Sequence, residues 1–224
     1  MISDNINAVT SKITKRCDKL GRPADSVKLI CVTKEADVSQ IEDALVCGIR
    51  NLGENRVQDL ISKYKAIGDA ATWHLIGHLQ TNKVKDAVRI STLIHSVDSL
   101  RLLREINNQA ARIGKVQGLL IQVNTSLEAT KFGIKPEEVK GFLNESLLYT
   151  NIDIKGLMTI APEYDDPEKA RPWFRVLREL RDEMNSLQIL RFQLKELSMG
   201  MSNDFEIAID EGATMVRVGR AIFT

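Results

Sequence analysis

Short apolar segments alternate with amphipathic segments along almost the whole chain. Residues 27–34 read Val-Lys-Leu-Ile-Cys-Val-Thr-Lys, with a turn-prone Gly-Arg-Pro before them and a helical pattern from Val38 after them. Apolar, β-branched runs of this kind are typical of parallel strands whose two faces are both covered by helices. Runs of this type recur along the chain, and we predict strands at 27–34, 49–53, 72–78, 93–97, 118–124, 152–160, 197–201 and 215–219.

Apolar residues at helical spacing precede and separate these runs. A first helix presents one apolar face, formed by Ile2, Ile6, Val9, Ile13 and Leu20. Near the other end of the chain, a proline suited to a first helical turn precedes a core face of Trp173, Leu177, Leu180, Met184 and Leu187. Strand then helix, eight times over, predicts a (β/α)8 TIM barrel in one domain spanning 1–224. An open doubly wound sheet is the alternative, which the scarcity of Gly-rich turns disfavours.

Composition and charge narrow the class of protein. The 224 residues carry a net charge of +1, which gives no field that would gather nucleic acid or an anionic membrane. No stretch approaches the ~20 apolar residues of a membrane span, and the N-terminus lacks the apolar core of a signal peptide. Cys17, Cys31 and Cys47 form no C-x-x-C pair, which favours free thiols in a reducing compartment. We therefore predict a cytoplasmic protein that binds neither nucleic acid nor membrane.

Lys34 ends the first predicted strand. Burying an ammonium group is costly, so a lone lysine at this place ordinarily marks where a strand meets water. In an α/β barrel, however, the loops after the strand ends build the active site. Partial desolvation or a nearby cation would there favour the neutral amine, which can form a Schiff base.

Two later loops have the composition of a phosphate site. In α/β barrels such a site often lies after strands seven and eight, here at 198–204 and 217–221. Gly200 and Gly219 would let backbone N–H groups approach a ligand, and Ser202 adds a hydroxyl. Taken singly, Ser202 or Asn203 is as well explained as a helix N-cap and Gly219 as a turn. Both loops standing at the expected place favour the phosphate site.

Arg217 and Asn55 are further candidates, each with two interpretations. Arg217 stands in an apolar strand and needs a partner, which is either a carboxylate such as Asp210 or Glu211 or a ligand's ring nitrogen. Asn55 follows the second strand directly, so it either reaches into the same mouth as Lys34 or caps the next helix.

The three histidines, His74, His78 and His95, are weak candidates for a metal site. A His-x3-His spacing places two ligands on one face of a helix, but His74 and His78 lie in a segment that reads as a strand. No third ligand stands at a diagnostic spacing, so we predict no metal. Histidines lining the barrel mouth or hydrogen-bonded in the core are the favoured interpretation.

A lysine, a phosphate cradle and an arginine between them would suit one ligand that carries an aldehyde, a phosphate and a ring nitrogen. Pyridoxal 5′-phosphate has all three. The pattern is not unique, because a Schiff-base aldolase acting on a sugar phosphate needs the first two features as well.

Longer segments carry a resemblance. Residues 73–83 read Trp-His-Leu-Ile-Gly-His-Leu-Gln-Thr-Asn-Lys and residues 197–202 read Leu-Ser-Met-Gly-Met-Ser. With 31–34, 53–58, 95–98, 122–124, 156–160 and 216–223, they closely resemble successive motifs of the pyridoxal phosphate homeostasis protein family. The resemblance covers nearly the whole chain in order. It implies a fold like the barrel domain of alanine racemase, standing alone without that enzyme's second β domain.

The resemblance also implies roles for individual residues. Lys34 would form the internal aldimine with pyridoxal phosphate, Asn55 would lie near the ring hydroxyl and Arg217 opposite the pyridine nitrogen. Ser202 and the backbone of Gly219 would surround the phosphate. Proteins of the family often have threonine-lysine-proline after the lysine, whereas this chain has Glu-Ala-Asp. An anion thus replaces a cation beside Lys34, which is expected to slow aldimine formation.

The family is thought to hold and deliver its cofactor without turnover. The resemblance therefore predicts a monomeric, non-catalytic protein of intracellular vitamin B6 homeostasis, with pyridoxal phosphate and pyridoxal phosphate-dependent apo-enzymes as partners. The alternative is an amino-acid racemase or decarboxylase on the same cofactor. A racemase needs a second acid–base group facing the substrate carbon. Of the tyrosines Tyr64, Tyr149 and Tyr164, only Tyr164 is predicted on the mouth side.

Overall fold

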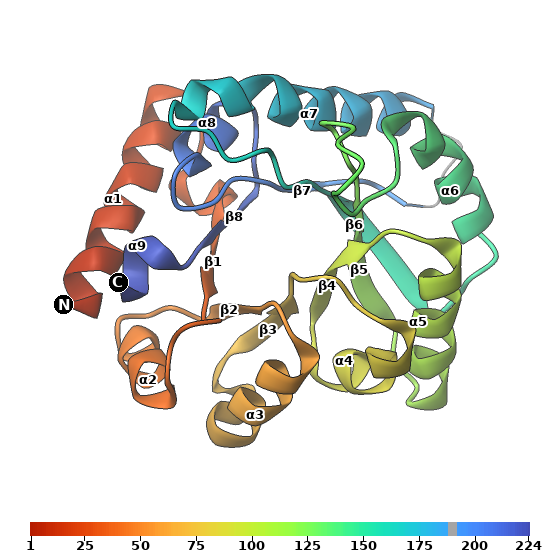
Figure 1. Cartoon of the computed structure of the whole chain (residues 1–224), viewed down its shortest axis with the longest axis horizontal. Helices are drawn as coiled ribbons and strands as arrows, with labels where there is room; N and C mark the ends of the chain where they lie inside the picture. The colour runs from red at the N-terminus through yellow and green to blue at the C-terminus, as the bar shows by residue number, and fades with distance from the viewer. Residues whose placement is uncertain (188–191) are drawn as a thin grey trace.

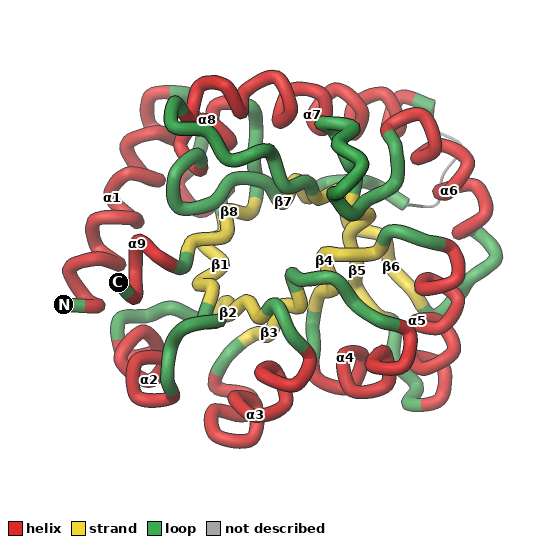
Figure 2. Tube along the Cα trace, in the orientation of Figure 1, coloured by secondary structure: helices red, strands yellow, loops and turns green. Residues whose placement is uncertain are grey.

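The computed structural model describes residues 1–187 and 192–224. Its parallel strands close into a barrel in chain order, because β1 pairs with β2 on one side and with β8 on the other (Figures 1 and 2). The predicted (β/α)8 barrel is confirmed. The strands are β1 Lys28–Val32, β2 Asn51–Glu54, β3 Thr72–Leu75, β4 Leu93–Val97, β5 Gln117–Gln122, β6 Ile152–Met158, β7 Glu196–Ser198 and β8 Met215–Val218.

Helices surround the barrel, as Figure 1 shows. The helix before β1 lies beside the short helix after β8, where the Asn5 side-chain amide donates to the Ile222 carbonyl at 3.0 Å. The two chain ends therefore lie close together. The helices are α1 Ile2–Lys19, α2 Val38–Val46, α3 Val57–Ile67, α4 Val84–Ile90, α5 Leu100–Arg112, α6 Val139–Ser146, α7 Arg171–Ser186, α8 Phe205–Asp210 and α9 Arg220–Phe223. Within the described ranges, none of them is both long and apolar enough to cross a membrane.

Local sequence explains where two of these helices begin. Asp37 and Gln40 form a capping box at the start of α2, in which each side chain accepts a hydrogen bond from the other residue's backbone N–H. Ser99 begins α5 by accepting a hydrogen bond from the Leu102 N–H at 3.3 Å.

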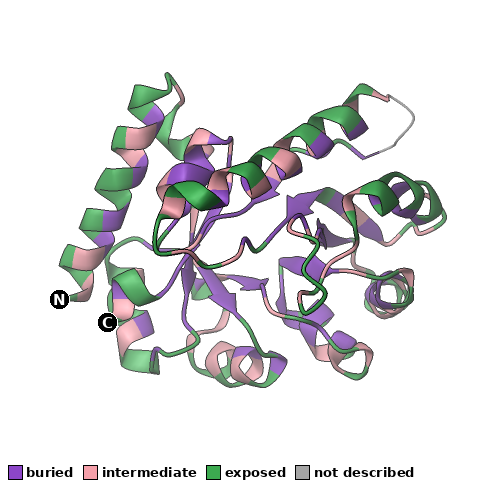
Figure 3. Ribbon diagram, turned by 45° about the horizontal axis from the view of Figure 1, so that its top comes forward, coloured by how far each residue is buried: buried purple, intermediate pink, exposed green. Residues whose placement is uncertain are grey.

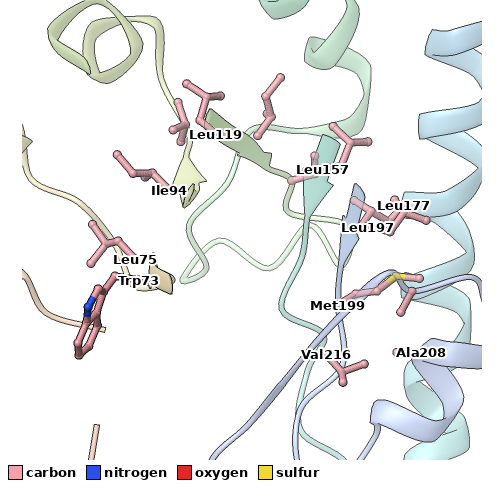
Figure 4. Close-up of a cluster of buried hydrophobic side chains, with 14 of the residues drawn as sticks. Trp73, Leu75, Ile94, Leu119, Leu157, Leu177, Leu197, Met199, Ala208 and Val216 are labelled. Carbon is pink, nitrogen blue, oxygen red and sulfur yellow. The ribbon is translucent and has the colours of Figure 1, made fainter. Parts of the chain in front are cut away.

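The larger apolar core lies between the strands and the helices. Figure 3 shows helices that are buried on the side facing the barrel and exposed outside. Outward-facing residues of successive strands, including Trp73, Ile94 and Leu157, meet helix residues such as Leu177 and Ala208 (Figure 4). The amphipathic pattern of the sequence follows from this layer, since each helix has one face to bury.

A second, smaller apolar cluster fills the interior of the barrel. We call it the apolar plug, and it consists of Ile30, Leu93, Leu120, Met158 and Met215, each 4% exposed or less. These residues come from five different strands. Side chains alternate between the two faces of a strand, so the residues two positions further along point into the barrel above the plug.

Several predicted boundaries were wrong by a few residues. The third, sixth and seventh strands end at Leu75, Met158 and Ser198, short of the predicted ends. The apolar residues beyond these ends, Ile76, Ile160 and Met201, do not extend the sheet. They line a cavity instead.

The ends of α1 and α7 also differ in detail from prediction. Leu20 lies beyond the end of α1 and is exposed. In α7, Phe174 is fully buried whereas Trp173 is only partly buried, so the core face is turned slightly from the predicted one. Helix α9 was not predicted.

Candidate functional site

A cavity of about 420 Å³ opens at the carboxyl ends of the strands. Five residues that the sequence singled out, Lys34, Asn55, Ser202, Arg217 and Gly219, line it, whereas the candidate Gly200 does not. They follow or end β1, β2, β7 and β8, so residues far apart in the chain meet in one place. The other lining residues are Val32, Glu35, Ile76, Gly77, Ile160, Glu163, Met201 and Arg220.

Lys34 stands two residues beyond the end of β1. Its side chain is 43% exposed, and its Nζ lies 3.1 Å from Oε1 of Glu35. The amine therefore reaches both the cavity and solvent. It is already paired with the Glu35 carboxylate before any ligand binds. The anion noticed in the sequence beside Lys34 is in contact with it.

The residue before Lys34 is fixed from outside the barrel. Glu54, fully buried, accepts hydrogen bonds at Oε1 from the Thr33 hydroxyl at 2.5 Å and from Lys63 Nζ at 2.7 Å. Lys63, on α3, also donates to the Thr33 carbonyl. A buried ion pair thus ties β1, β2 and α3 together immediately before Lys34. No pattern in the sequence singled out Lys63.

Ser202 and Gly219 face each other across the loops after β7 and β8. The Ala221 backbone N–H donates to Ser202 Oγ at 3.4 Å. A Cβ on Gly219 would lie 2.8 Å from the Val32 carbonyl oxygen, so a larger residue would disturb the neighbouring strand end. Ser202 does not begin the following helix, because Asp204 is the N-cap of α8. The cap interpretation of Ser202 is therefore wrong.

Arg217 lies under the cavity and is 4% exposed. Its Nη1 donates to Ser198 Oγ at 2.7 Å and its Nη2 donates to the Thr159 carbonyl at 2.9 Å. Burial lowers the pKa of the guanidinium to about 10, with Asp204 acting in the opposite direction. The group is still charged at neutral pH.

The carboxylates proposed as partners of Arg217 are engaged elsewhere. Asp210 binds Arg16 and Arg171, and Glu211 binds Arg171 and two further arginines of α7. Among residues 1–187 and 192–224, no carboxylate forms an ion pair with Arg217. The guanidinium donates to two neutral oxygens, and Arg217 also lines the cavity.

Asn55 lies at the cavity wall and does not cap the next helix. The N-cap of α3 is Arg56, with no side-chain cap hydrogen bond. The backbone carbonyl of Asn55 lies so close to Gly77 that a Cβ on Gly77 would overlap the carbonyl oxygen. Of the two interpretations of Asn55, the structure agrees with a side chain at the barrel mouth and not with a helix cap.

His74 and His95 are hydrogen-bonded inside the barrel, as the favoured interpretation expected. His74 Nδ1 lies 3.0 Å from His95 Nε2, and His95 Nδ1 lies 2.9 Å from Ser198 Oγ. Burial, and then the charge of Lys28, lower the pKa of His74 to about 4. Burial also lowers the pKa of His95, and the nearby His74 and Arg217 lower it further.

His78 stands apart from this pair. Its ring stacks on Phe132 with centroids 4.0 Å apart, and its Nδ1 lies 3.4 Å from Asp98. Within the described ranges, no group of three or more His, Cys, Asp or Glu side chains could hold a metal ion.

The cavity rim carries charges that sequence reasoning missed. Arg220 binds Glu163 at 2.9 Å, joining the loop after β6 to the start of α9. With Glu35 on the opposite loop, two carboxylates and one paired guanidinium surround the opening. Arg220 could have been found from the sequence, because it directly follows the candidate Gly219. Glu163 could not, because it lies in a loop that carries no motif.

Comparison with known proteins assigns the chain to a family. The family described as alanine racemase, N-terminal domain, matches residues 7–224. A protein of Aquifex aeolicus named pyridoxal phosphate homeostasis protein is 43% identical over 221 residues, which cover 98% of this chain and 96% of that protein. The chain belongs to the pyridoxal phosphate homeostasis protein family. The resemblance seen in the sequence motifs is thereby confirmed.

Solved structures of similar proteins agree with this family assignment. PipY of Synechococcus elongatus, solved with pyridoxal phosphate bound, has a TM-score of 0.86 and 32% identity, and the match covers all of both chains. Alanine racemase of Corynebacterium glutamicum has a TM-score of 0.69 at 15% identity, with 99% of this chain covering 60% of that one. The pyridoxal phosphate homeostasis proteins thus share their barrel with part of a larger enzyme.

Proposed function

We propose that this protein binds pyridoxal 5′-phosphate and serves intracellular vitamin B6 homeostasis, holding the cofactor on Lys34 without turning over a substrate. One observation carries the proposal: a single cavity brings together an amine, a hydroxyl beside a backbone turn and a buried charged donor. Those groups match the aldehyde, phosphate and ring nitrogen of the cofactor. The relatives' name and the cofactor-bound PipY structure support it.

Each site residue has a task that its position allows. Lys34 would hold the cofactor covalently, because a neutral amine can condense with an aldehyde with loss of one water. Ser202 and the backbone at Gly219 would donate to phosphate oxygens, and Asn55 would offer its amide to the ring hydroxyl. Arg217 would donate to the ring nitrogen with a guanidinium N–H. When bound, the cofactor would supply an electrophilic carbon and a ring that can accept electrons.

Two features support the absence of turnover. Arg217 holds only donors and stays charged, so it offers no proton to a ring nitrogen and leaves the ring a weak electron acceptor. The tyrosines provide no second acid–base group at the cavity. Tyr164, the one predicted there, accepts a hydrogen bond from Trp173 Nε1 at 3.0 Å and does not line the cavity.

The proposal also includes one domain spanning 1–224, a monomer in the cytoplasm, and apo-enzymes that receive the cofactor.

The test is to load the protein with pyridoxal phosphate, reduce it with borohydride and map the modified peptide. We expect one modified residue, Lys34, and no covalent colour in Lys34→Ala. Lys83→Ala is the matched control, because Lys83 lies outside the cavity, and it should retain the colour. Modification mapped to another lysine would contradict the proposed site.

Turnover is tested on the loaded protein with each common L-amino acid, following the D-isomer and carbon dioxide. We expect no steady product. Steady product that disappears in Lys34→Ala would make the protein a racemase or a decarboxylase instead.

A further inference from the structure

A continuous line of hydrogen bonds crosses the barrel interior and ends at Arg217. It begins at Asn51 on β2, whose Oδ1 lies 3.2 Å from His74 Nε2. It passes from His74 on β3 to His95 on β4, from there to Ser198 on β7, and then to Arg217 on β8. We call this set the polar chain. It joins five strands, and only its Arg217 end reaches the cavity.

The chemistry of Arg217 sets the direction of the first bond. A guanidinium has donors and no acceptor, so Ser198 Oγ must accept from Nη1. The hydroxyl proton is then free to donate, and the second partner of Ser198 Oγ among the described residues is His95 Nδ1 at 2.9 Å. The hydroxyl therefore donates to His95. If His95 donated instead, the buried hydroxyl would be left without an acceptor, which is costly.

The remaining bonds follow from the first. A neutral His95 that accepts at Nδ1 carries its proton on Nε2 and donates it to His74 Nδ1. His74 likewise carries its proton on Nε2 and donates to Asn51 Oδ1. Ser198, His95 and His74 each accept once and donate once, so the bonds run in one direction from Arg217 to Asn51. Burial disfavours the charged form of both rings, which keeps each of them able to accept.

We propose that Asn51, His74, His95 and Ser198 are positioning residues that aim the charged end of Arg217 at the ring nitrogen of the cofactor, with both histidines neutral and protonated on Nε2. In many sites a carboxylate would orient an arginine. Here no carboxylate among the described residues pairs with it, so its charge is not neutralised and remains directed at the cavity. The inference rests on the proposed function for the identity of the ligand, but not for the arrangement of the polar chain.

The first test needs no cofactor. Nitrogen-15 NMR of histidine-labelled protein at neutral pH reports which ring nitrogen carries the proton. We expect two rings in the Nε2–H form, and the third signal is assigned to His78 by its loss in His78→Gln. Either buried ring found charged, or protonated on Nδ1, overturns the direction of the polar chain. This measurement stands even if the protein fails to bind pyridoxal phosphate, in which case the proposed function fails alone.

The second test separates aiming from general packing. Ser198→Ala removes one of the two acceptors of Arg217, whereas Ser198→Thr retains a hydroxyl. Two ligands are compared: pyridoxal phosphate, and its 1-deaza analogue, in which CH replaces the ring nitrogen. We expect Ser198→Ala to weaken pyridoxal phosphate about tenfold and the analogue less than about twofold. Ser198→Thr should restore most of the difference, and His78→Gln should change neither affinity.

Equal weakening of both ligands by Ser198→Ala would overturn the proposal, because a residue that only packs the barrel affects them alike. If Ser198→Ala does not fold, His95→Gln takes its place. Its amide can still accept from the Ser198 hydroxyl, but it breaks the link to His74. We expect a smaller loss, again confined to pyridoxal phosphate, and equal loss for the analogue would again be decisive against it.

Discussion

The barrel interior contains two buried regions of opposite chemistry. The apolar plug has no polar side-chain atom, whereas the polar chain has no aliphatic residue. They share strands: Leu93 precedes His95 by two positions on β4, and Met215 precedes Arg217 by two positions on β8. Both members of each pair point into the barrel, and both are buried. Burial alone therefore does not distinguish a residue that holds the fold from one that serves the site.

The two regions differ in the interactions that are lost when one of their residues is substituted. A plug residue contributes contact and excluded water, which any similar apolar side chain can partly replace. A residue of the polar chain has specific donors and acceptors, and its loss leaves a buried partner unsatisfied. The fold thus uses the apolar plug for stability and the polar chain for direction.

The largest effect is expected in the apolar plug. Leu120→Ala should lower the free energy of unfolding by about 2–5 kcal/mol, because a fully buried leucine leaves a cavity that the surrounding strands cannot close. The affinity of the folded protein for pyridoxal phosphate should change less than about twofold. Urea unfolding and a binding titration measure the two quantities. Leu120→Met, which conserves volume, is the control and should cost less than about 1.5 kcal/mol. A large loss of affinity in Leu120→Ala would remove the distinction between the two regions.

An intermediate effect is expected at the cavity, where a substitution should lower ligand affinity and leave stability nearly unchanged. Ser202→Ala should weaken pyridoxal phosphate by about ten- to a hundredfold, since a hydrogen bond to a charged group contributes about 1.5–3 kcal/mol. Its stability should stay within about 0.5 kcal/mol of the unchanged protein, because Ser202 does not cap α8 and its hydrogen bond from the Ala221 N–H is long, at 3.4 Å, and exposed. Unphosphorylated pyridoxal is the matched ligand and should bind equally to both proteins. Equal losses for the two ligands would show that Ser202 acts on the loop rather than on the phosphate.

The smallest effect concerns pH and the polar chain. The pKa of His74 is lowered from 6.5 to about 4, so between these values the unfolded chain binds a proton that the folded chain does not. Stability therefore falls as the pH drops below about 6.5, and the loss from this histidine is about 2 kcal/mol by pH 5. Urea unfolding from pH 7.5 to 5 checks the slope. A flat profile in the original protein would contradict neutral buried histidines.

The sequence predicted the barrel because its signal is repeated in every unit. Apolar runs and amphipathic helices recur with the same period, so an error at one boundary does not alter the topology. Boundaries failed where apolar residues have a second use, as at Ile76 and Ile160, which line the cavity. Periodicity cannot tell a residue that pairs in a sheet from one that borders a ligand.

The site was predictable where residues stand directly after strands, as Lys34 and Asn55 do. The side chains that support them were not. Lys63 appears in the sequence as one of several lysines on an amphipathic helix, and its contact with Glu54 depends on how α3 packs on β2. His95 and Ser198 are 103 residues apart in sequence, and only closure of the barrel brings them together.

The buried pair of Glu54 and Lys63 has a consequence for binding kinetics. Because it clamps the Thr33 carbonyl and hydroxyl, the backbone that leads into Lys34 is already ordered before a ligand arrives. On the attachment proposed above, the conformational entropy lost would be confined to the side chain of Lys34, and the loop would contribute little to it. Preorganisation of this kind favours a site that can load and release its ligand repeatedly without rearranging the chain around it.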